Sequence, residues 1–197
     1  MKHALIVAHP NQHSFTMAMA HAYAEAAAAR NDAVLLRDLY RMEFDPCLHA
    51  DELPWAVNYK LRADVVAERG LLAAVDVFVF VYPFWFNAPP AILKGYVDRV
   101  FGMGFGYDAT PPGAKPLLVG RRMISVTSSG APKYWVDQSG ALDAERKLFD
   151  EHIAAVCGMS VIDHLHFGRV TQGIREDAVG ICAAAVRAAV ARIAPSN

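Results

Sequence analysis

The sequence has few charged residues for its length and no strong excess of either sign. Charged residues make up 20% of the 197 positions, against 54% for the apolar and aromatic types. The 19 Lys and Arg residues nearly balance 20 Asp and Glu residues, which gives a formal net charge of -1. A chain without a basic excess has no field that draws it to nucleic acid or anionic lipid. We therefore expect small molecules, or a second copy of the chain, as its partners.

Cysteine is also scarce. The three cysteines, Cys47, Cys157 and Cys182, are odd in number and far apart, which excludes a disulfide framework or a CxxC motif. We expect all three to be buried thiols in a reducing compartment. The apolar run after Lys2 and His3 is too short for a signal peptide, and no charge-free segment is long enough to cross a bilayer. These absences predict a cytoplasmic protein with no membrane span.

Several sequence motifs of known chemistry are missing. There is no GxGxxG dinucleotide fingerprint, no Walker P-loop and no GxSxG nucleophile turn. HExxH and clustered Cys/His spacings are absent as well. His164 and His166 alternate along one predicted strand and so share a face, but two ligands without a third are more typical of surface residues. We therefore predict no metal site.

What the sequence does contain is five apolar strand patterns alternating with helical ones. This alternation predicts one α/β domain over residues 1–197, a doubly wound parallel sheet in the order 2-1-3-4-5 with helices on both faces. The segment 40–62 is expected to be a functional loop, and 102–106 with the turn at 111–113 a second loop. The expected strands are 4–8, 33–39, 77–81, 123–127 and 160–165; the expected helices are 14–30, 63–74, 89–101, 141–156 and a terminal helix along 179–193.

Three loops follow the first, third and fourth predicted strands and should meet at one end of the sheet, where ligands bind in this class of fold. In the first loop, Ser14 and Thr16 begin a helix whose free N–H groups and dipole attract phosphate. His9 is either a hydrogen-bond donor to that phosphate or a strand-end histidine with ordinary local hydrogen bonds. The pattern predicts a phosphate-bearing ligand here.

The second and third loops suit a flat ring system. Trp85 and Phe86 come where a strand ends, so they either form the wall of a slot or pack under the next helix or in a subunit interface. Asn87 offers an amide to the edge of such a ring. The small polar run 127–130 lets backbone N–H groups approach a ligand, although ordinary turns have the same composition.

Taken together, the motifs resemble the NAD(P)H:quinone oxidoreductases of the DT-diaphorase type and their bacterial relatives, which include ancillary subunits of potassium-efflux systems. The resemblance covers residues 3–135 closely and the remainder loosely, and it implies a flavodoxin-like fold. It is carried, in matching order and separation, by the segments 8–10, 14–18, 38–46, 90–95, 98–101, 105–107 and 127–130.

The resemblance implies a non-covalent flavin, FAD rather than FMN because of the Ser-Phe-x-x-Ala segment at 14–18. It implies NADH or NADPH as co-substrate and a two-electron, ping-pong transfer to a quinone or similar acceptor. The implied flavin contacts are His9, Ser14, Phe15, Thr16 and Ala18 at the phosphate arm, and Pro83, Phe84, Trp85, Phe86, Asn87, Thr127, Ser128, Ser129 and Gly130 at the ring.

The resemblance further implies a homodimer with its active site at the interface. Tyr134 resembles the family's active-site tyrosine, while Tyr107, with Phe105, resembles the aromatic lining of the partner's site. The histidine that mammalian-type members carry shortly after that tyrosine is absent, since 137–141 reads Asp-Gln-Ser-Gly-Ala. The proton donor is therefore not identified by the resemblance.

Two other functions are compatible with the sequence. One is a regulatory flavoprotein subunit that docks on a membrane transporter such as a potassium-efflux system. The other is a one-electron carrier, but such carriers are usually strongly acidic and the net charge here is only -1.

Overall fold

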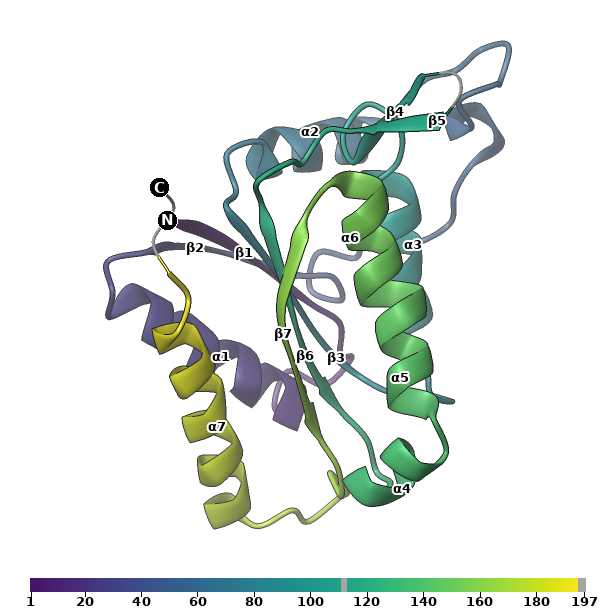
Figure 1. Cartoon of the computed structure of the whole chain (residues 1–197). Coiled ribbons are helices and arrows are strands. Elements are labelled where there is room, and N and C mark those ends of the chain that lie inside the picture. The colour runs from purple at the N-terminus through teal and green to yellow at the C-terminus, as the bar shows by residue number, and fades with distance from the viewer. Residues whose placement is uncertain (111–112, 195–197) are drawn as a thin grey trace.

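The computed structural model describes residues 1–110 and 113–194. Its centre is a parallel sheet of five strands in the order β2-β1-β3-β6-β7. Because β4 and β5 lie outside this sheet, the order is the predicted 2-1-3-4-5, and the doubly wound fold is confirmed (Figure 1). The strands are β1 (Lys2–Val7), β2 (Ala33–Asp38), β3 (Val77–Pro83), β6 (Arg122–Ser128) and β7 (Ser160–Phe167).

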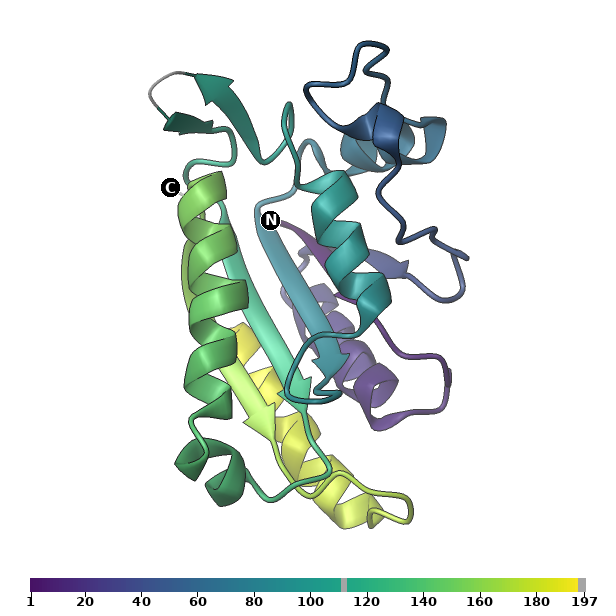
Figure 2. The same ribbon diagram turned by 90° about the vertical axis from the view of Figure 1, so that its right-hand side faces the viewer.

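Helices cover both faces of the sheet. Figure 2 shows α1 and α7 behind the sheet and the α5–α6 column in front of it, with α3 beside that column. A short 3-10 turn at Ala50–Glu52 interrupts the loop 40–62. The helices are α1 (Phe15–Ala28), α2 (Ala63–Leu72), α3 (Ala91–Val100), α4 (Lys133–Gln138), α5 (Ala141–Glu145), α6 (His152–Cys157) and α7 (Glu176–Ala191).

Alternation along the central strands produces two separate cores. Leu5 and Val79 point toward α1 and α7, where they pack with Met19, Tyr23 and Val186. The alternate residues of the same strands, such as Ile6 and Phe80, point to the opposite face and belong to a second core with α2, α3 and α6. A strand buried on both faces needs apolar residues at every position, which is why 77–81 is a continuous apolar run.

Three features differ from the sequence expectation. Tyr107–Thr110 (β4) and Gly113–Pro116 (β5) pair as an antiparallel hairpin in a region expected to be a loop; residues 111 and 112 of the expected turn lie outside the described residues. The expected helix 141–156 contains a π-helical segment, Arg146–Glu151, between α5 and α6. Of the three cysteines expected to be buried, only Cys157 is; Cys47 is exposed in the surface loop 40–62, and Cys182 on α7 is half-buried.

Gly95 in α3 permits a close contact with the loop 40–62. A Cβ atom at this position would lie 2.1 Å from the carbonyl oxygen of Pro46, so either the helix or the loop would have to move. We expect Gly95→Ala to lower the free energy of unfolding by about 1–3 kcal/mol. Gly180→Ala in α7 is the matched control, because nothing lies within 4 Å of its Cβ position. Denaturant midpoints measure both; equal midpoints would contradict this contact.

Within the described ranges, no helix of the structure is long and apolar enough to cross a membrane.

Candidate functional site

A pocket of about 530 Å³ opens where β1, β3 and β6 end, a volume typical of small-molecule sites. Of the residues expected at a flavin, ten line it: His9, Ser14, Phe15, Thr16, Pro83, Phe84, Trp85, Ser128, Ser129 and Gly130. The three predicted loops therefore do meet at one end of the sheet. The remaining lining residues are Asn11, His13, Val170, Thr171, Gln172, Gly173 and Ile174.

The N-terminus of α1 forms one end of this pocket. Ser14 caps the helix, and its hydroxyl accepts a hydrogen bond from the N–H of Met17 at 3.2 Å. The N–H groups of Phe15 and Thr16 in the first turn donate to no protein acceptor among the described residues. Together with the helix dipole, these free donors make the pocket end suitable for an anion.

His9 adds a further donor next to this helix end. Its Nδ1 faces the backbone of Asn11, with the N–H at 3.0 Å and the carbonyl oxygen at 3.2 Å. In the tautomer that makes the shorter contact, Nδ1 accepts and the proton of the neutral ring lies on Nε2. Burial lowers the pKa of His9 below its ordinary value, helped by the Arg41 guanidinium and opposed by the hydrogen bond to Asn11 and by Asp38. In that tautomer His9 is a neutral Nε2–H donor.

The lining carries no formal negative charge. None of the seventeen lining residues in the described part of the chain is Asp, Glu, Lys or Arg. The polar groups are hydroxyls, amides and two imidazoles, and the apolar wall includes Phe84 and Trp85. This combination fits a ligand that has a phosphate at one end and an aromatic ring system at the other.

The aromatic loop after β3 is a tight turn. Trp85 and Ala88 exchange two backbone hydrogen bonds of 3.0 and 3.2 Å, and Phe86 and Asn87 between them have φ of 54° and 57°. Positive φ at both central positions is the type I′ geometry, which Asn tolerates and Phe rarely adopts. The turn presents Trp85 to the pocket but leaves the Phe86 side chain fully exposed.

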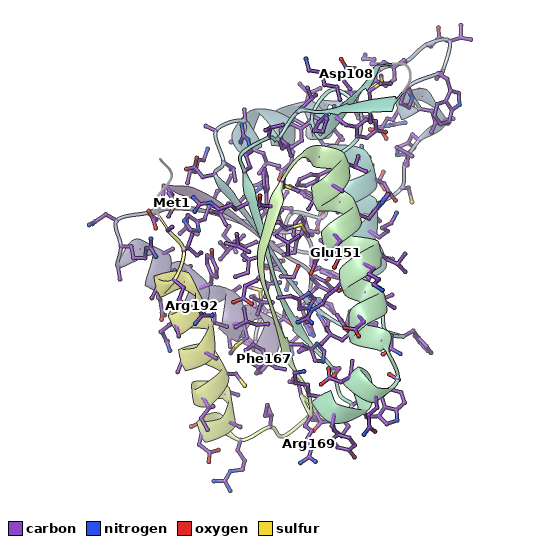
Figure 3. The ribbon with its side chains drawn as sticks, in the orientation of Figure 1. Met1, Asp108, Glu151, Phe167, Arg169 and Arg192 are labelled. Carbon is purple, nitrogen blue, oxygen red and sulfur yellow. The ribbon has the colours of Figure 1, made fainter. Side chains whose placement is uncertain are left out.

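Seven predicted site residues do not line this pocket. Phe86 and Asn87 are exposed on the turn. Ala18, within α1, packs partly buried against the core, and Thr127 turns inward to contact His164 and His166. Tyr134 is 59% exposed on α4. Phe105 and Tyr107 lie at the hairpin end of the molecule, next to Asp108 in the sequence. Arg169 directly precedes the pocket residue Val170. Figure 3 shows Asp108 and Arg169 at opposite ends of the molecule.

The sequence expectation missed the wall formed by residues 170–174. This segment follows β7 and is fixed to the loop after β6, since the N–H of Val170 donates to the carbonyl of Ser129 at 2.9 Å. The predicted sheet order could have indicated this wall, because β7 is parallel to its neighbour β6 and its carboxyl end therefore reaches the same edge of the sheet. Asn11 and His13 were passed over within a loop that was otherwise predicted.

His164 and His166 were expected to be surface residues, but the structure buries both side chains. His166 is 7% exposed, and the side chain of His164 is 3% exposed. Their shared face of β7 is covered by the α5–α6 column, because the neighbouring Leu165 and Phe167 pack toward α1 and α7.

Comparisons with known proteins agree with this geometry. A family model described as "Flavodoxin-like fold" matches residues 1–192. An uncharacterized NAD(P)H oxidoreductase from Haemophilus influenzae is 31% identical over 86% of this chain and 85% of its own. NAD(P)H dehydrogenase [quinone] 1 from Rattus norvegicus is 30% identical over 83% of this chain and 67% of its own. The FMN complex of an FMN-dependent NADH-azoreductase from Bacillus anthracis has a TM-score of 0.71, 20% identity and coverage of 98% and 99%.

Proposed function

Because this chain belongs to the flavodoxin-like fold family, together with NAD(P)H dehydrogenase [quinone] 1, we propose that it is a flavin-dependent NAD(P)H oxidoreductase that reduces a quinone or similar acceptor. The observation that carries the proposal is the pocket itself. It joins the free N–H groups at the start of α1 to the aromatic wall of Phe84 and Trp85, without a carboxylate.

The residues of the pocket fit a flavin. The amides of Phe15 and Thr16 and the Nε2–H of His9 would hold its phosphate arm, and Trp85 with the 128–130 backbone would flank the ring. A bound flavin would supply the hydride chemistry, as acceptor from NAD(P)H and as two-electron donor to the quinone. The protein would orient first the nicotinamide ring and then the quinone ring against the flavin, and would exclude water, as a ping-pong cycle requires.

FAD and FMN differ in the phosphate arm that the start of α1 would bind. The 14–18 segment favours FAD by resemblance, whereas the structurally similar azoreductase was solved with FMN. Titration of the flavin-free chain with each cofactor, followed by flavin fluorescence, separates the two. Steady-state oxidation of NADH and NADPH with menadione then tests the activity, and no oxidation with either flavin would reject the proposal.

Trp85 is the proposed wall of the ring site. We expect Trp85→Ala to raise the dissociation constant of the flavin about tenfold, equivalent to about 1.4 kcal/mol of lost ring packing. Trp135→Ala is the control, because Trp135 is similarly exposed, at 49% against 41%, yet lies on α4 outside the pocket. Fluorescence titration measures both variants; an equal effect of the two substitutions would contradict this placement.

We also propose a homodimer that completes the site. Tyr107 and Phe105 lie at the end of the molecule opposite the pocket, so they can line a flavin site only in a partner subunit (Figure 1). Tyr134, exposed beside the pocket on α4, would face the acceptor at the same interface. Light scattering should give twice the 21.5 kDa mass of the chain; a monomer at micromolar concentration would contradict the proposal.

A further inference from the structure

A buried cluster of acid groups and a histidine lies beneath the candidate flavin pocket. Glu145 ends α5, Asp150 lies in the π-helical segment, and His164 comes from β7. The carboxylate oxygens and the imidazole nitrogen of the three residues all lie within 4.8 Å of one another. The π-helical segment matters here, because its wider turn lets two carboxyls five positions apart face the sheet.

Each member of the cluster is held by a further hydrogen bond. Ser125 donates to Asp150 Oδ1 at 2.7 Å, and Asp150 Oδ2 lies 2.5 Å from His164 Nδ1. The Tyr82 hydroxyl is paired with Glu145 Oε1. Glu145 Oε2 is buried with no hydrogen-bond partner among the described residues, and His164 Nδ1 lies 3.8 Å away. A buried oxygen without a hydrogen bond is tolerable in a neutral carboxyl and costly in a charged one.

Protons, rather than a metal ion, fit this spacing. Two ligands of one tetrahedral ion with bonds near 2.0–2.1 Å lie about 3.3 Å apart. The 2.5 Å between His164 Nδ1 and Asp150 Oδ2 is shorter than this separation, because the two atoms are joined directly by a hydrogen bond.

A continuous row of hydrogen bonds leads from this cluster to the pocket. His164 Nε2 lies 2.8 Å from Thr127 Oγ1, and the same oxygen lies 2.9 Å from Nδ1 of His166. His166 Nε2 is 3.0 Å from Oγ of Ser129, which lines the pocket. Every step from His164 to Ser129 is within hydrogen-bond distance, and Glu145 Oε2 lies 3.8 Å from His164 Nδ1 at the start of the row.

The donors from His164 to His166 can all point toward Ser129, which lines the pocket. The Ser129 hydroxyl donates to the carbonyl of Ala131 at 2.9 Å, so its oxygen is free to accept from His166 Nε2–H. His166 Nδ1 then accepts from the Thr127 hydroxyl, and Thr127 accepts from His164 Nε2–H. This assignment satisfies every group in the row.

We infer that Glu145, Asp150 and His164 form a proton reserve that is linked to the flavin pocket through Thr127, His166 and Ser129. The inference rests on the proposed function, because it is that reaction which needs the proton. NAD(P)H gives one hydride, whereas a hydroquinone carries two electrons and two protons, so each cycle consumes one proton besides the hydride. The reserve supplies this proton while bound substrate excludes water, and regains it from water when the pocket empties.

The charge states at neutral pH agree with this role. Burial, then the adjacent Asp150, raises the pKa of Glu145 to about 8, against the opposing effects of Tyr82 and Arg146. Glu145 therefore still holds a proton at pH 7.

The linking histidine is neutral at the same pH. Burial, then His164, lowers the pKa of His166 to about 4. Lys133 and Arg146 also lower it, and Asp137 opposes them. A neutral imidazole has one donor and one acceptor nitrogen, which is what a proton relay requires.

The first test uses the flavin-free chain. With ¹³C-labelled carboxyl groups, NMR should show Glu145 titrating near pH 8, and Glu145→Gln should remove that titration. Glu151→Gln, in the same π-helical segment but exposed, should leave it in place. Titration of Glu145 near pH 4 would overturn the proposal, as would an equimolar bound metal in the purified chain.

The second test uses the flavin-loaded enzyme. Thr127→Val removes the central hydroxyl while keeping the shape of the side chain, and we expect acceptor reduction at pH 7 to slow at least tenfold with flavin affinity changed less than twofold. Thr127→Ser retains the hydroxyl and should recover most of the rate. Glu145→Gln should abolish the ionisation near pH 8 in the rate profile.

Failure of the relay is distinguishable from failure of the proposed function. If the wild-type enzyme is active and Thr127→Val and Glu145→Gln keep its rate and pH profile, the relay is wrong and the activity stands. If the loaded wild-type chain oxidises no NAD(P)H, the proposed function fails and the relay fails with it.

Discussion

Ser14→Asp is expected to weaken flavin binding at least 100-fold while leaving the thermal stability of the chain unchanged or slightly raised. Ser14 is the N-cap of α1 and lines the pocket where the phosphate arm is proposed to bind. Aspartate caps helices as well as serine does, and its charge favours the helix dipole, so the fold should tolerate it. The new carboxylate, however, would stand next to the phosphate.

The size of this effect follows from Coulomb's law. Two like charges about 5 Å apart at an effective dielectric constant of about 20 repel by about 3 kcal/mol, which is roughly a 100-fold change in affinity. Ser14→Asn is the matched control, because it keeps the cap without the charge. Fluorescence titration of both variants measures the result. Equal affinities for Ser14→Asp and Ser14→Asn would show that no phosphate binds at this helix end.

The second large effect concerns Arg99, whose side chain is fully buried. Its guanidinium binds Glu52 at 2.9 Å and Asp64 at 2.7 Å, and it donates to the carbonyl of Asp45 at 2.7 Å. The ring of Phe44 lies 5.2 Å from the guanidinium carbon. One residue of α3 thus ties the loop 40–62 and α2 to the body of the molecule.

We expect Arg99→Met to lower the free energy of unfolding by about 3–5 kcal/mol, because it leaves the buried Glu52 carboxylate without its partner. Chemical denaturation measures this change. Arg175→Met is the control, since Arg175 pairs with Asp177 at the exposed surface, where ion pairs contribute about 0–1 kcal/mol. Similar losses in both variants would contradict the structural role of Arg99.

The destabilisation caused by Arg99→Met should shrink in acid. Burial pushes the pKa of Glu52 up, but the hydrogen bonds and charge of Arg99, together with backbone hydrogen bonds from His49 and Arg62, outweigh burial and hold that pKa below its ordinary value. A carboxyl with a depressed pKa stabilises the fold above its ordinary pKa and loses that contribution as pH falls through the depressed value. The difference between wild type and Arg99→Met should therefore decrease below about pH 4.

The sheet and its order were predictable because each strand is short, apolar and bounded by turn residues. Val77–Pro83 illustrates this, since burial on both faces leaves no alternation to confuse with a helix. The β4–β5 hairpin was not predictable in the same way. Tyr107–Thr110 and Gly113–Pro116 pair with each other outside the main sheet and have few apolar residues to mark them as strands.

The pocket was predictable in position more than in detail. Strand ends fix where the loops meet, so His9, Ser14 and Ser129 could be placed together from the sequence. Whether a side chain at a strand end faces the pocket or the interior depends on its position in the alternation along the strand. Thr127 and Ser128 are adjacent, yet Ser128 lines the pocket and Thr127 joins the buried histidines.

The buried cluster was beyond prediction for a different reason. Glu145 and Asp150 come from a helix whose π-helical segment shifts the facing positions, and nothing in an alanine-containing helical pattern marks such a shift. His164 and His166 were recognised as sharing a face, but only the packed structure places the carboxyls over them.

The most direct test of the central claim is the visible absorbance of the flavin-loaded chain under anaerobic conditions. Addition of NADH or NADPH should bleach the visible absorption band of the flavin, and menadione added afterwards should restore it. That cycle, with the loaded chain yellow at the start, is the result predicted here. A chain that binds neither FAD nor FMN, or a bound flavin that NAD(P)H leaves oxidised, would contradict the account.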